Sequence, residues 1–401
     1  MVPEEIMRSL AIRNEAKIVL LVIDGLGGLP VDGRTELEAA DMPNLNRLAQ
    51  TSVCGLCYPL ARGITPGSGP SHLALFGYDP FKYEIGRGVL EALGVGLEIG
   101  PDDVAARGNF ATINEKGIIT DRRAGRIATE KSREICALLR RSIKSVEGAQ
   151  VTIEPGKEHR FTILFRREGL DGRLSDSDPQ KNGLRAQPAE ALVEEAAPTA
   201  RVVNKFIAEA NKALAGSYPV NTVLLRGFAK YPSIPSMREL FKLNPAAIAT
   251  YPMYRGLAKL VGMTVLDAGD TLDSEVECLR RNYEKFDFFY MHYKHTDSRG
   301  EDGNFQAKVE AIEEVDKCVP AVLALEPDVV AVTGDHSTPA LLKAHSWHPN
   351  PLMLWSKYIQ NDVVKKFTEL ECAHGALGTL MAVDVMPLLL AHALKMEKFG
   401  A

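Results

Sequence analysis

The stretch Val329–Pro339, VVAVTGDHSTP, predicts a buried strand that ends at two adjacent polar side chains. Its apolar first half has the length and composition of a parallel strand covered on both faces. Asp335 and His336 follow where this strand should end, and open α/β sheets bind ligands at the carboxyl ends of their strands. In the loop after a strand, a carboxylate and an imidazole can serve two neighbouring metal ions. An ordinary turn with a solvated histidine would give the same local pattern.

The same arrangement occurs at two other places in the chain. Lys17–Ile23 is a continuous apolar stretch followed by Asp24, and Phe286–His292 is followed by a polar loop that contains Asp297 and Glu301. These two acids are four residues apart, so one helical turn or a tight loop would direct both toward one ion. Because parallel strands end at the same edge of a sheet, we expect the three strand ends to meet.

A glycine- and proline-rich loop adds a hydroxyl group to this inventory. Residues 65–80 read TPGSGPSHLALFGYDP, and the prolines at 66 and 70 exclude a regular helix or a central strand around them. A serine in a glycine-rich turn before a helix N-terminus is well placed to hold a phosphoryl group. Ser68 is therefore the candidate nucleophile and Ser71 is the alternative, while a plain surface loop would also fit this composition.

The candidate ligands together match one kind of chemistry. The segment HSWHP at 345–349 adds His345, and neutral imidazole is a common metal ligand. Carboxylates, imidazoles and one hydroxyl at a common edge are the inventory of a two-ion phosphoryl-transfer site. Mixed carboxylate and histidine ligands favour Mn²⁺ or Zn²⁺ over Ca²⁺. The pattern therefore predicts two divalent ions, with Mg²⁺ and Co²⁺ as further candidates and no organic cofactor.

Composition excludes several other classes of protein. The 401 residues carry a formal net charge of −5 without a basic block, so we expect no nucleic-acid partner. No apolar run approaches the roughly 18–20 residues of a membrane span, and no secretory signal is expected at the N-terminus. The six cysteines lack the spacing of a disulfide framework, which favours a reducing, cytoplasmic location. The oligomeric state is left open.

The order of predicted elements indicates an α/β protein with an insertion. Strands and helices alternate over 1–99 and 188–401, which predicts a core with a mainly parallel sheet, including a strand at Asn221–Leu225. Between 100 and 187, short alternating strands surround one helix near 129–142. This change of pattern predicts a smaller inserted α+β domain.

The inserted region also carries a basic cluster. It contains DRRAGR at 121–126 and His159-Arg160. Guanidinium groups pair with carboxylate and phosphate, so these residues are candidates for an anion clamp. The alternative is that the arginines form an ordinary solvated surface.

The chain resembles a known family, the archaeal-type, cofactor-independent (2,3-bisphosphoglycerate-independent) phosphoglycerate mutases of the alkaline phosphatase superfamily. The resemblance runs nearly end to end and rests on eight segments: VLLVIDGLGGLP (19–30), TELEAADMPNLNRLA (35–49), PGSGPSHLALFGYDP (66–80), GRGVLEALG (86–94), NFAT (109–112), DRRAGRI (121–127), TGDHSTP (333–339) and HSWHP (345–349). It implies an alkaline-phosphatase-like three-layer core.

The resemblance also implies roles for individual residues. Ser68 would be the phosphorylated nucleophile and would ligate one ion together with Asp24, Asp335 and His336. The second ion would be bound by Asp297, position 301 and His345. This chain has Glu301 where many relatives are expected to have histidine. Lys294, Arg123, Arg126 and His159 would bind the substrate.

The implied activity is the interconversion of 3-phosphoglycerate and 2-phosphoglycerate in glycolysis and gluconeogenesis. Its small-molecule substrate would be trapped between the domains, because water in the site would hydrolyse the phosphoserine. The first alternative is another phosphoryl-transfer enzyme on the same core, such as a phosphatase, a phosphopentomutase or a homoserine-kinase-like enzyme. The second is a metal-binding or regulatory protein with an inactive site.

Overall fold

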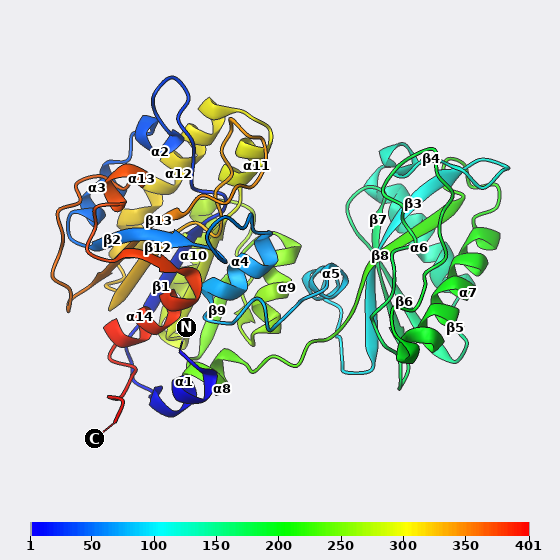
Figure 1. Ribbon diagram of the computed structural model, residues 1–401, viewed down its shortest axis with the longest axis horizontal. Helices are drawn as coiled ribbons and strands as arrows, with labels where there is room; N and C mark the ends of the chain where they lie inside the picture. The colour runs from blue at the N-terminus through cyan, green and yellow to red at the C-terminus, as the bar shows by residue number, and fades with distance from the viewer. Residues whose placement is uncertain (1, 401) are drawn as a thin grey trace. The chain divides into compact units, whose positions relative to one another are not determined.

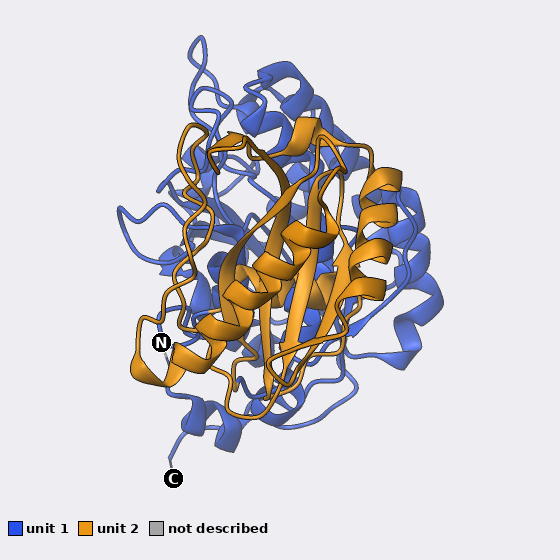
Figure 2. Ribbon diagram, turned by 90° about the vertical axis from the view of Figure 1, so that its right-hand side faces the viewer, with its two compact units in different colours: residues 1–84, 234–401 blue, residues 85–233 orange. Residues whose placement is uncertain are grey.

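The structure, a computed structural model, describes residues 2–400 and divides into two compact units. The first unit combines Met1–Glu84 with Ile234–Ala401, and the second is Ile85–Ser233 (Figure 2). The second unit is thus an insertion within the chain of the first, as the change of pattern predicts.

The first unit is built on a mainly parallel sheet. Within residues 2–400, this sheet has eight strands, and only β13 runs against the others. Their spatial order is β10 (Thr264–Val265), β9 (Pro245–Ile248), β11 (Phe288–Tyr293), β1 (Ile18–Ile23), β12 (Val329–Thr333), β13 (Asn350–Ser356), β2 (Val53–Tyr58) and β14 (Gly378–Met381).

The central strands are buried on both faces. Val19, Leu21 and Ile23 of β1 pack in one hydrophobic cluster with α3 (Pro43–Ala49) and α12 (Phe305–Leu323). Leu20 and Val22 face the other side and are also buried. This explains why β1 is uniformly apolar instead of alternating. The core is a helix–sheet–helix sandwich (Figure 1).

Helices of the first unit connect these strands. They are α1 (Glu4–Leu10), α2 (Glu36–Ala39), α3 (Pro43–Ala49), α4 (Ser68–Leu75), α8 (Met237–Phe241), α9 (Pro252–Leu260), α10 (Leu272–Asn282), α11 (His295–Glu301), α12 (Phe305–Leu323), α13 (Glu369–Cys372) and α14 (Val385–His392), with 3₁₀ turns η3 (Tyr283–Lys285) and η4 (Ala382–Asp384).

The second unit has its own sheet and core. Its strands are β3 (Asp103–Ile113), β4 (Ile119–Asp121), β5 (Ser145–Val146), β6 (Ala149–Pro155), β7 (Arg160–Arg166) and β8 (Thr222–Lys230), with β8 paired to β3. Its helices are α5 (Arg87–Gly94), α6 (Thr129–Ser142) and α7 (Ala197–Ala213), with 3₁₀ turns η1 (Ala124–Arg126) and η2 (Glu194–Ala196). Helices α6 and α7 pack on one face of this sheet (Figure 2).

The boundaries of this unit differ from the predicted 100–187. The strand expected at Asn221–Leu225 in the parallel core is β8, which pairs antiparallel with β3, so that placement is wrong. Helix α5 also belongs to this unit, because Gly88 lets it approach β3; a β-carbon there would lie 2.7 Å from the carbonyl oxygen of Ala105. Strand patterns show which segments are extended but do not identify their partners.

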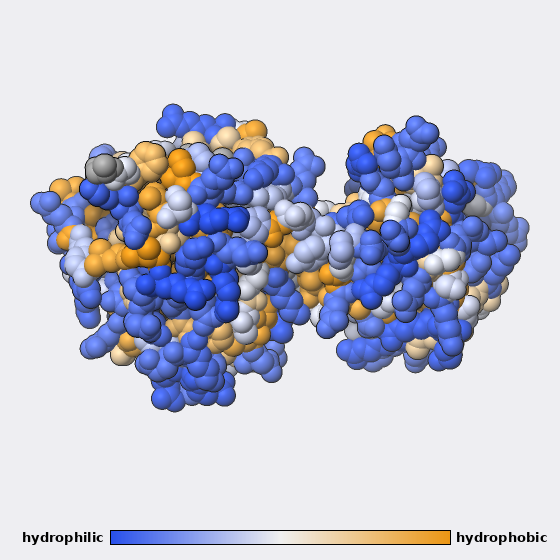
Figure 3. All heavy atoms as spheres, turned by 90° about the horizontal axis from the view of Figure 1, so that it is seen from below, coloured by the Kyte–Doolittle hydropathy of each residue, from blue (hydrophilic) through white to orange (hydrophobic). Residues whose placement is uncertain are grey.

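The visible surface is mainly hydrophilic, and the cysteines are free. On the face shown in Figure 3, hydrophilic side chains predominate and apolar ones form smaller groups. All six cysteines are buried and free of disulfide bonds. In the part of the chain that the structure describes, no helix combines the length and hydropathy needed to cross a membrane.

Candidate active site

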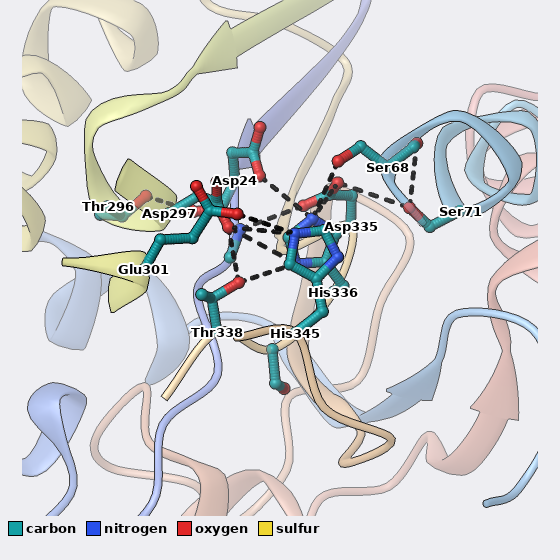
Figure 4. Close-up of polar contacts among 12 residues, drawn as sticks. Asp24, Ser68, Ser71, Thr296, Asp297, Glu301, Asp335, His336, Thr338 and His345 are labelled. Carbon is teal, nitrogen blue, oxygen red and sulfur yellow. Dashed lines mark hydrogen bonds and ion pairs between the residues drawn. The ribbon is translucent and has the colours of Figure 1, made fainter. Parts of the chain in front are cut away.

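Three neighbouring strands deliver the predicted polar residues to one edge of the sheet. Strand β1 lies between β11 and β12 and runs parallel to both. Asp24 follows β1, Asp297 lies in α11 directly after β11, and Asp335 with His336 follows β12. The structure therefore brings these side chains together from segments up to about three hundred residues apart (Figure 4).

The first cluster, here called the Asp24 group, consists of Asp24, Ser68, Asp335 and His336. His336 Nε2 lies 3.1 Å from Asp335 Oδ2, 3.4 Å from Asp24 Oδ1 and 3.2 Å from Ser68 Oγ. The two carboxylates and the imidazole are fully buried, whereas Ser68 is half-buried. Ser68 is thus the most accessible member of this group.

The second cluster, the Asp297 group, consists of Asp297, Glu301 and His345. His345 Nε2 lies 3.6 Å from Asp297 Oδ1 and 3.8 Å from Glu301 Oε1. His345 Nδ1 lies 2.9 Å from the carbonyl oxygen of Pro66, to which it donates, so Nε2 carries the free lone pair. The Glu301 side chain is 56% exposed, which leaves it free to turn toward an ion.

His336 lies near both groups, and hydrogen bonding decides to which one it belongs. Its Nδ1 is 3.0 Å from Thr338 Oγ1 and 3.9 Å from Asp297 Oδ1. Since the threonine hydroxyl occupies the Nδ1 side, Nε2 remains available for the Asp24 group. The two imidazoles, His336 and His345, stack with ring centroids 3.6 Å apart.

The donor set fits divalent cations. Asp24 Oδ1 is buried and has no hydrogen-bond partner among residues 2–400, so its lone pairs are available to a cation. Burial acts to raise the pKa of Asp24, but the hydrogen bond from His292 and the charge of Lys294 hold the pKa well below its usual value. Two ionised carboxylates that face each other in the interior require cationic compensation.

The serine loop distinguishes the two nucleophile candidates. Ser68 is the first residue of α4, and its hydroxyl faces the Asp24 group (Figure 4). Ser71 is fully buried, and its hydroxyl lies 3.0 Å from the carbonyl oxygens of both Gly67 and Ser68. Ser71 thus has two local backbone partners, and its hydroxyl also lies 3.4 Å from Asp335 Oδ2. Ser68, in contrast, is presented at a helix N-terminus, where anions are stabilised.

Lys294 lies between the two groups. Its Nζ is 3.1 Å from Asp24 Oδ2 and 2.5 Å from Asp297 Oδ2. Burial acts to lower the pKa of Lys294, but the carboxylates of Asp24 and Asp297 raise it above the usual value. Lys294 is therefore a permanent positive charge at the centre of the site.

Three further aromatic residues support the site and were not identified from the sequence. His292 Nε2 donates to Asp24 Oδ2 at 3.0 Å, and His72 Nδ1 lies 3.2 Å from Asp335 Oδ2. Tyr254 accepts a hydrogen bond of 3.0 Å from Lys294 and stacks on His292. The available signals were weak: His72 lies one helical turn after Ser68, and His292 ends an apolar strand.

The remaining predicted substrate ligands lie in the second unit. Arg123 and Arg126 are exposed around the turn η1, and His159 is buried. Burial and the neighbouring Arg160 lower the pKa of His159 to about 4, so its imidazole is neutral near pH 7. The structure does not group these three with the first unit's site residues.

One face of the second sheet carries a larger cluster of arginines, whose members Arg107 and Arg226 were not identified from the sequence. Arg107 of β3 lies opposite Arg226 of β8, and Arg160 of β7 lies opposite Asn109 of β3. These positions alternate with Ala106 and Phe110, which face the core under α6 and α7. In the part of the chain that the structure describes, Arg107 Nε, Arg226 Nε and Asn109 Oδ1 are buried without a hydrogen-bond partner.

Known proteins resemble this chain over nearly its whole length. The model of the 2,3-bisphosphoglycerate-independent phosphoglycerate mutase family matches residues 49–221. A protein from Thermotoga neapolitana, named probable 2,3-bisphosphoglycerate-independent phosphoglycerate mutase, is 54% identical over 398 residues, with 99% of each chain covered. A protein of the same name from Thermus thermophilus is 52% identical over 401 residues, again with 99% of each chain covered.

Two solved structures share the fold. A cofactor-independent phosphoglycerate mutase from Thermoplasma acidophilum is 31% identical, with a TM-score of 0.75 over 94% of this chain and 100% of that one. A structure from Pyrococcus horikoshii has a TM-score of 0.83 at 29% identity, covering 96% of this chain and 100% of that one. Both units of the chain are therefore covered by known structures.

Proposed function

The chain belongs to the 2,3-bisphosphoglycerate-independent phosphoglycerate mutases, which interconvert 3-phosphoglycerate and 2-phosphoglycerate, and we propose that it does so through a phosphoserine at Ser68. The observation that carries this proposal is the position of the Ser68 hydroxyl. It lies at the N-terminus of α4, 3.2 Å from His336 Nε2, beside two buried carboxylates that have the geometry of ion ligands.

The proposed transfer takes place in two steps, first to Ser68 and then to the C2 oxygen of the glycerate. In the first, Ser68 Oγ attacks the phosphorus of 3-phosphoglycerate; the bond from Oγ to phosphorus forms and the bond to the substrate's C3 oxygen breaks. The proton of the serine hydroxyl is lost, and the C3 oxygen gains a proton. In the second step, the C2 hydroxyl loses its proton and its oxygen attacks the phosphoserine, so the phosphoryl group moves to C2 and Ser68 regains a proton.

The proposed site holds two divalent ions. The Asp24 group would bind one and the Asp297 group the other, with Mn²⁺ or Zn²⁺ as the expected metals and Mg²⁺ or Co²⁺ as alternatives. When bound, such ions supply Lewis-acid charge to the attacking and leaving oxygens of a phosphoryl transfer. The protein's part is to hold the ligands: His345 by its bond to Pro66, and Asp24 by its bond from His292.

Lys294 contributes charge that does not depend on an ion. Its ammonium group lies between Asp24 and Asp297 and stays protonated, because the carboxylates raise its pKa. A fixed cation next to Asp24 and Asp297 stabilises the negative charge that the phosphoryl oxygens carry during transfer. Tyr254, which accepts a hydrogen bond from Lys294, fixes the direction of this side chain.

The arginines of the second unit support binding of an anionic substrate. Burial raises the pKa of Glu91, while the charges of Arg107, Arg87, Arg160 and Arg226 act to lower it, and Arg107 Nη1 lies 2.9 Å from Glu91 Oε1. Four positive charges thus act on a single carboxylate. Such a concentration of like charges is unfavourable without an anion, and guanidinium groups bind phosphate and carboxylate in forked geometry. We extend the proposal to this cluster and to Arg123, Arg126 and His159.

The free cysteines support a cytoplasmic location.

A phosphorus NMR time course tests the proposed reaction. The purified protein is stripped of metal, reloaded with Mn²⁺, and supplied with 3-phosphoglycerate in the absence of bisphosphoglycerate. After removal of the paramagnetic ion, the spectrum should show 2-phosphoglycerate at the expense of the substrate. Free phosphate alone would contradict the proposal and favour a phosphatase, because it would mean that water, not the glycerate, accepts the phosphoryl group.

Replacing Glu301 with alanine is expected to weaken one of the two ions selectively. Glu301 is the third member of the Asp297 group, so its loss should reduce the affinity of that ion by about 10- to 100-fold while the Asp24 group keeps its own ion. Calorimetric titration with Mn²⁺ measures both affinities. The control is Asp302→Ala, which removes the adjacent exposed acid. Equal Mn²⁺ affinities in Glu301→Ala and Asp302→Ala would show that Glu301 does not ligate the ion.

Replacing Arg226 with glutamine is expected to raise the KM for 3-phosphoglycerate. A lost charge-assisted hydrogen bond corresponds to about a 10- to 100-fold change in affinity. Within residues 2–400 no carboxylate lies within ion-pair distance of Arg226, so the variant should not lose thermal stability. Arg173→Gln, which removes an exposed arginine paired with Asp171, is the control. An unchanged KM in both variants would remove Arg226 from the proposed clamp.

A further inference from the structure

The hydroxyl group of Thr338 lies between the two proposed ion sites. Thr338 Oγ1 is 2.6 Å from Asp297 Oδ1 and 3.0 Å from His336 Nδ1 (Figure 4). Asp297 belongs to one group and His336 to the other, and all three side chains are buried. A single hydroxyl therefore contacts one member of each group.

The number of available protons fixes the direction of both hydrogen bonds. A carboxylate can only accept, so the single hydroxyl proton of Thr338 must be donated to Asp297. The hydroxyl oxygen can then only accept from His336, which requires a proton on Nδ1. His336 is thereby held as the tautomer whose Nε2 lone pair faces Asp24 and Asp335.

The backbone around Thr338 prevents the hydroxyl from moving away. The Thr338 N–H lies 3.2 and 3.1 Å from the carbonyl oxygens of Gly25 and Gly27, in the loop that follows Asp24. Its carbonyl oxygen accepts a 2.9 Å hydrogen bond from the fully buried Lys308, which also donates to Gly27 at 3.0 Å. Thr338 is thus tied to the loop after β1 and to helix α12.

Gly25 leaves the space that this arrangement needs. Its φ of +65° is unfavourable for residues with a side chain. A β-carbon on Gly25 would lie 2.7 Å from Thr338 Oγ1 and 2.8 Å from the Asp297 backbone. The glycine therefore permits close contact between the β1 loop, α11 and the Thr338 hydroxyl.

We propose that Thr338 is a positioning residue that couples the two ion sites, setting the tautomer of His336 and the orientation of Asp297 through one shared hydroxyl. The proposal rests on the proposed two-ion site. Because the same hydroxyl serves both groups, an ion bound at one should favour binding at the other. The identities of the proposed ligand residues do not by themselves indicate a role for Thr338 or a coupling between the two ion sites.

Thr338→Val tests this inference, because it removes the hydroxyl and preserves the shape of the side chain. Calorimetric titration with Mn²⁺ should show both affinities falling by about 10-fold or more, with the two ions binding independently. Thr338→Ser, which restores the hydroxyl, should bring affinity and coupling back toward the wild-type values. Thr333→Val is the control for a buried threonine, since Thr333 donates to the Pro351 carbonyl and contacts neither group.

A second measurement keeps the inference testable if Thr338→Val does not fold. The ¹⁵N NMR spectrum of the metal-free wild-type protein reports which nitrogen of His336 carries the proton when no ion occupies Nε2. A proton on Nδ1 supports the proposal, and a proton on Nε2 overturns it. Wild-type affinities in Thr338→Val would also overturn it, whereas a wild-type protein that binds no ions would refute the proposed function itself.

Discussion

The Ser68→Ala variant is expected to lose at least about 10⁴-fold in the rate of interconversion, the scale seen when a nucleophile is removed from a covalent mechanism. The loss should appear in kcat, because the Ser68 hydroxyl, 3.2 Å from His336 Nε2, is the group that accepts the phosphoryl group in the proposed transfer. Substrate binding should be less affected, since the proposed anion clamp is formed by arginines in a different unit.

A trapped intermediate makes this prediction specific. Wild-type protein quenched during turnover should show the added mass of one phosphoryl group, which peptide mapping should assign to Ser68. Ser68→Ala should show none. An alanine variant that still converts 3-phosphoglycerate at a rate close to the wild type would exclude the covalent mechanism, whatever its metal content.

Ser71→Ala provides the matched control. Ser71 is three residues away on the same helix, and its hydroxyl is within 3.0 Å of the Gly67 and Ser68 carbonyl oxygens. Losing it should cost about 1 kcal/mol of stability, as for one ordinary hydrogen bond. Ser71→Ala should therefore remain phosphorylated at Ser68. If Ser71→Ala carried no phosphoryl group, the nucleophile would be wrongly assigned.

The sequence was informative where a site residue follows directly from its strand. Asp24, Asp297 and Asp335 each come after an apolar segment, and the rule that parallel strands end at one edge is sufficient to bring them together. The parallel core and the existence of an inserted unit follow from the same patterns. These features depend on local composition, which a single sequence displays.

The sequence was uninformative where a role depends on contacts between distant segments. Thr338 acts through Asp297 and His336, and His72 through Asp335. A threonine after a strand and a histidine in a helix are common, so only their hydrogen bonds distinguish them. Likewise, the partnership of Arg107 with Arg226 depends on the pairing of β3 with β8, which strand patterns do not specify.

Removing divalent ions with a chelator is expected to abolish interconversion, by more than about 1,000-fold, and restoring Mn²⁺ should recover it. The protein should remain folded, because Lys294 compensates Asp24 and Asp297, and His72 contacts Asp335. Its melting temperature should nevertheless fall, since an ion present at 100 times its dissociation constant contributes about 2.7 kcal/mol to stability.

The ion titration then connects activity to particular ligands. If both groups bind as proposed, activity should return only with the second equivalent of Mn²⁺. The Asp24 group, which includes Ser68, would bind one ion, the Asp297 group, which has its own imidazole in His345, would bind the other, and the proposed transfer needs both. In Glu301→Ala, the second equivalent should require a higher concentration, and activity should follow its occupancy. Full activity at one ion per chain would contradict a two-ion mechanism. In that case Lys294 would supply the positive charge that we assign to the second ion.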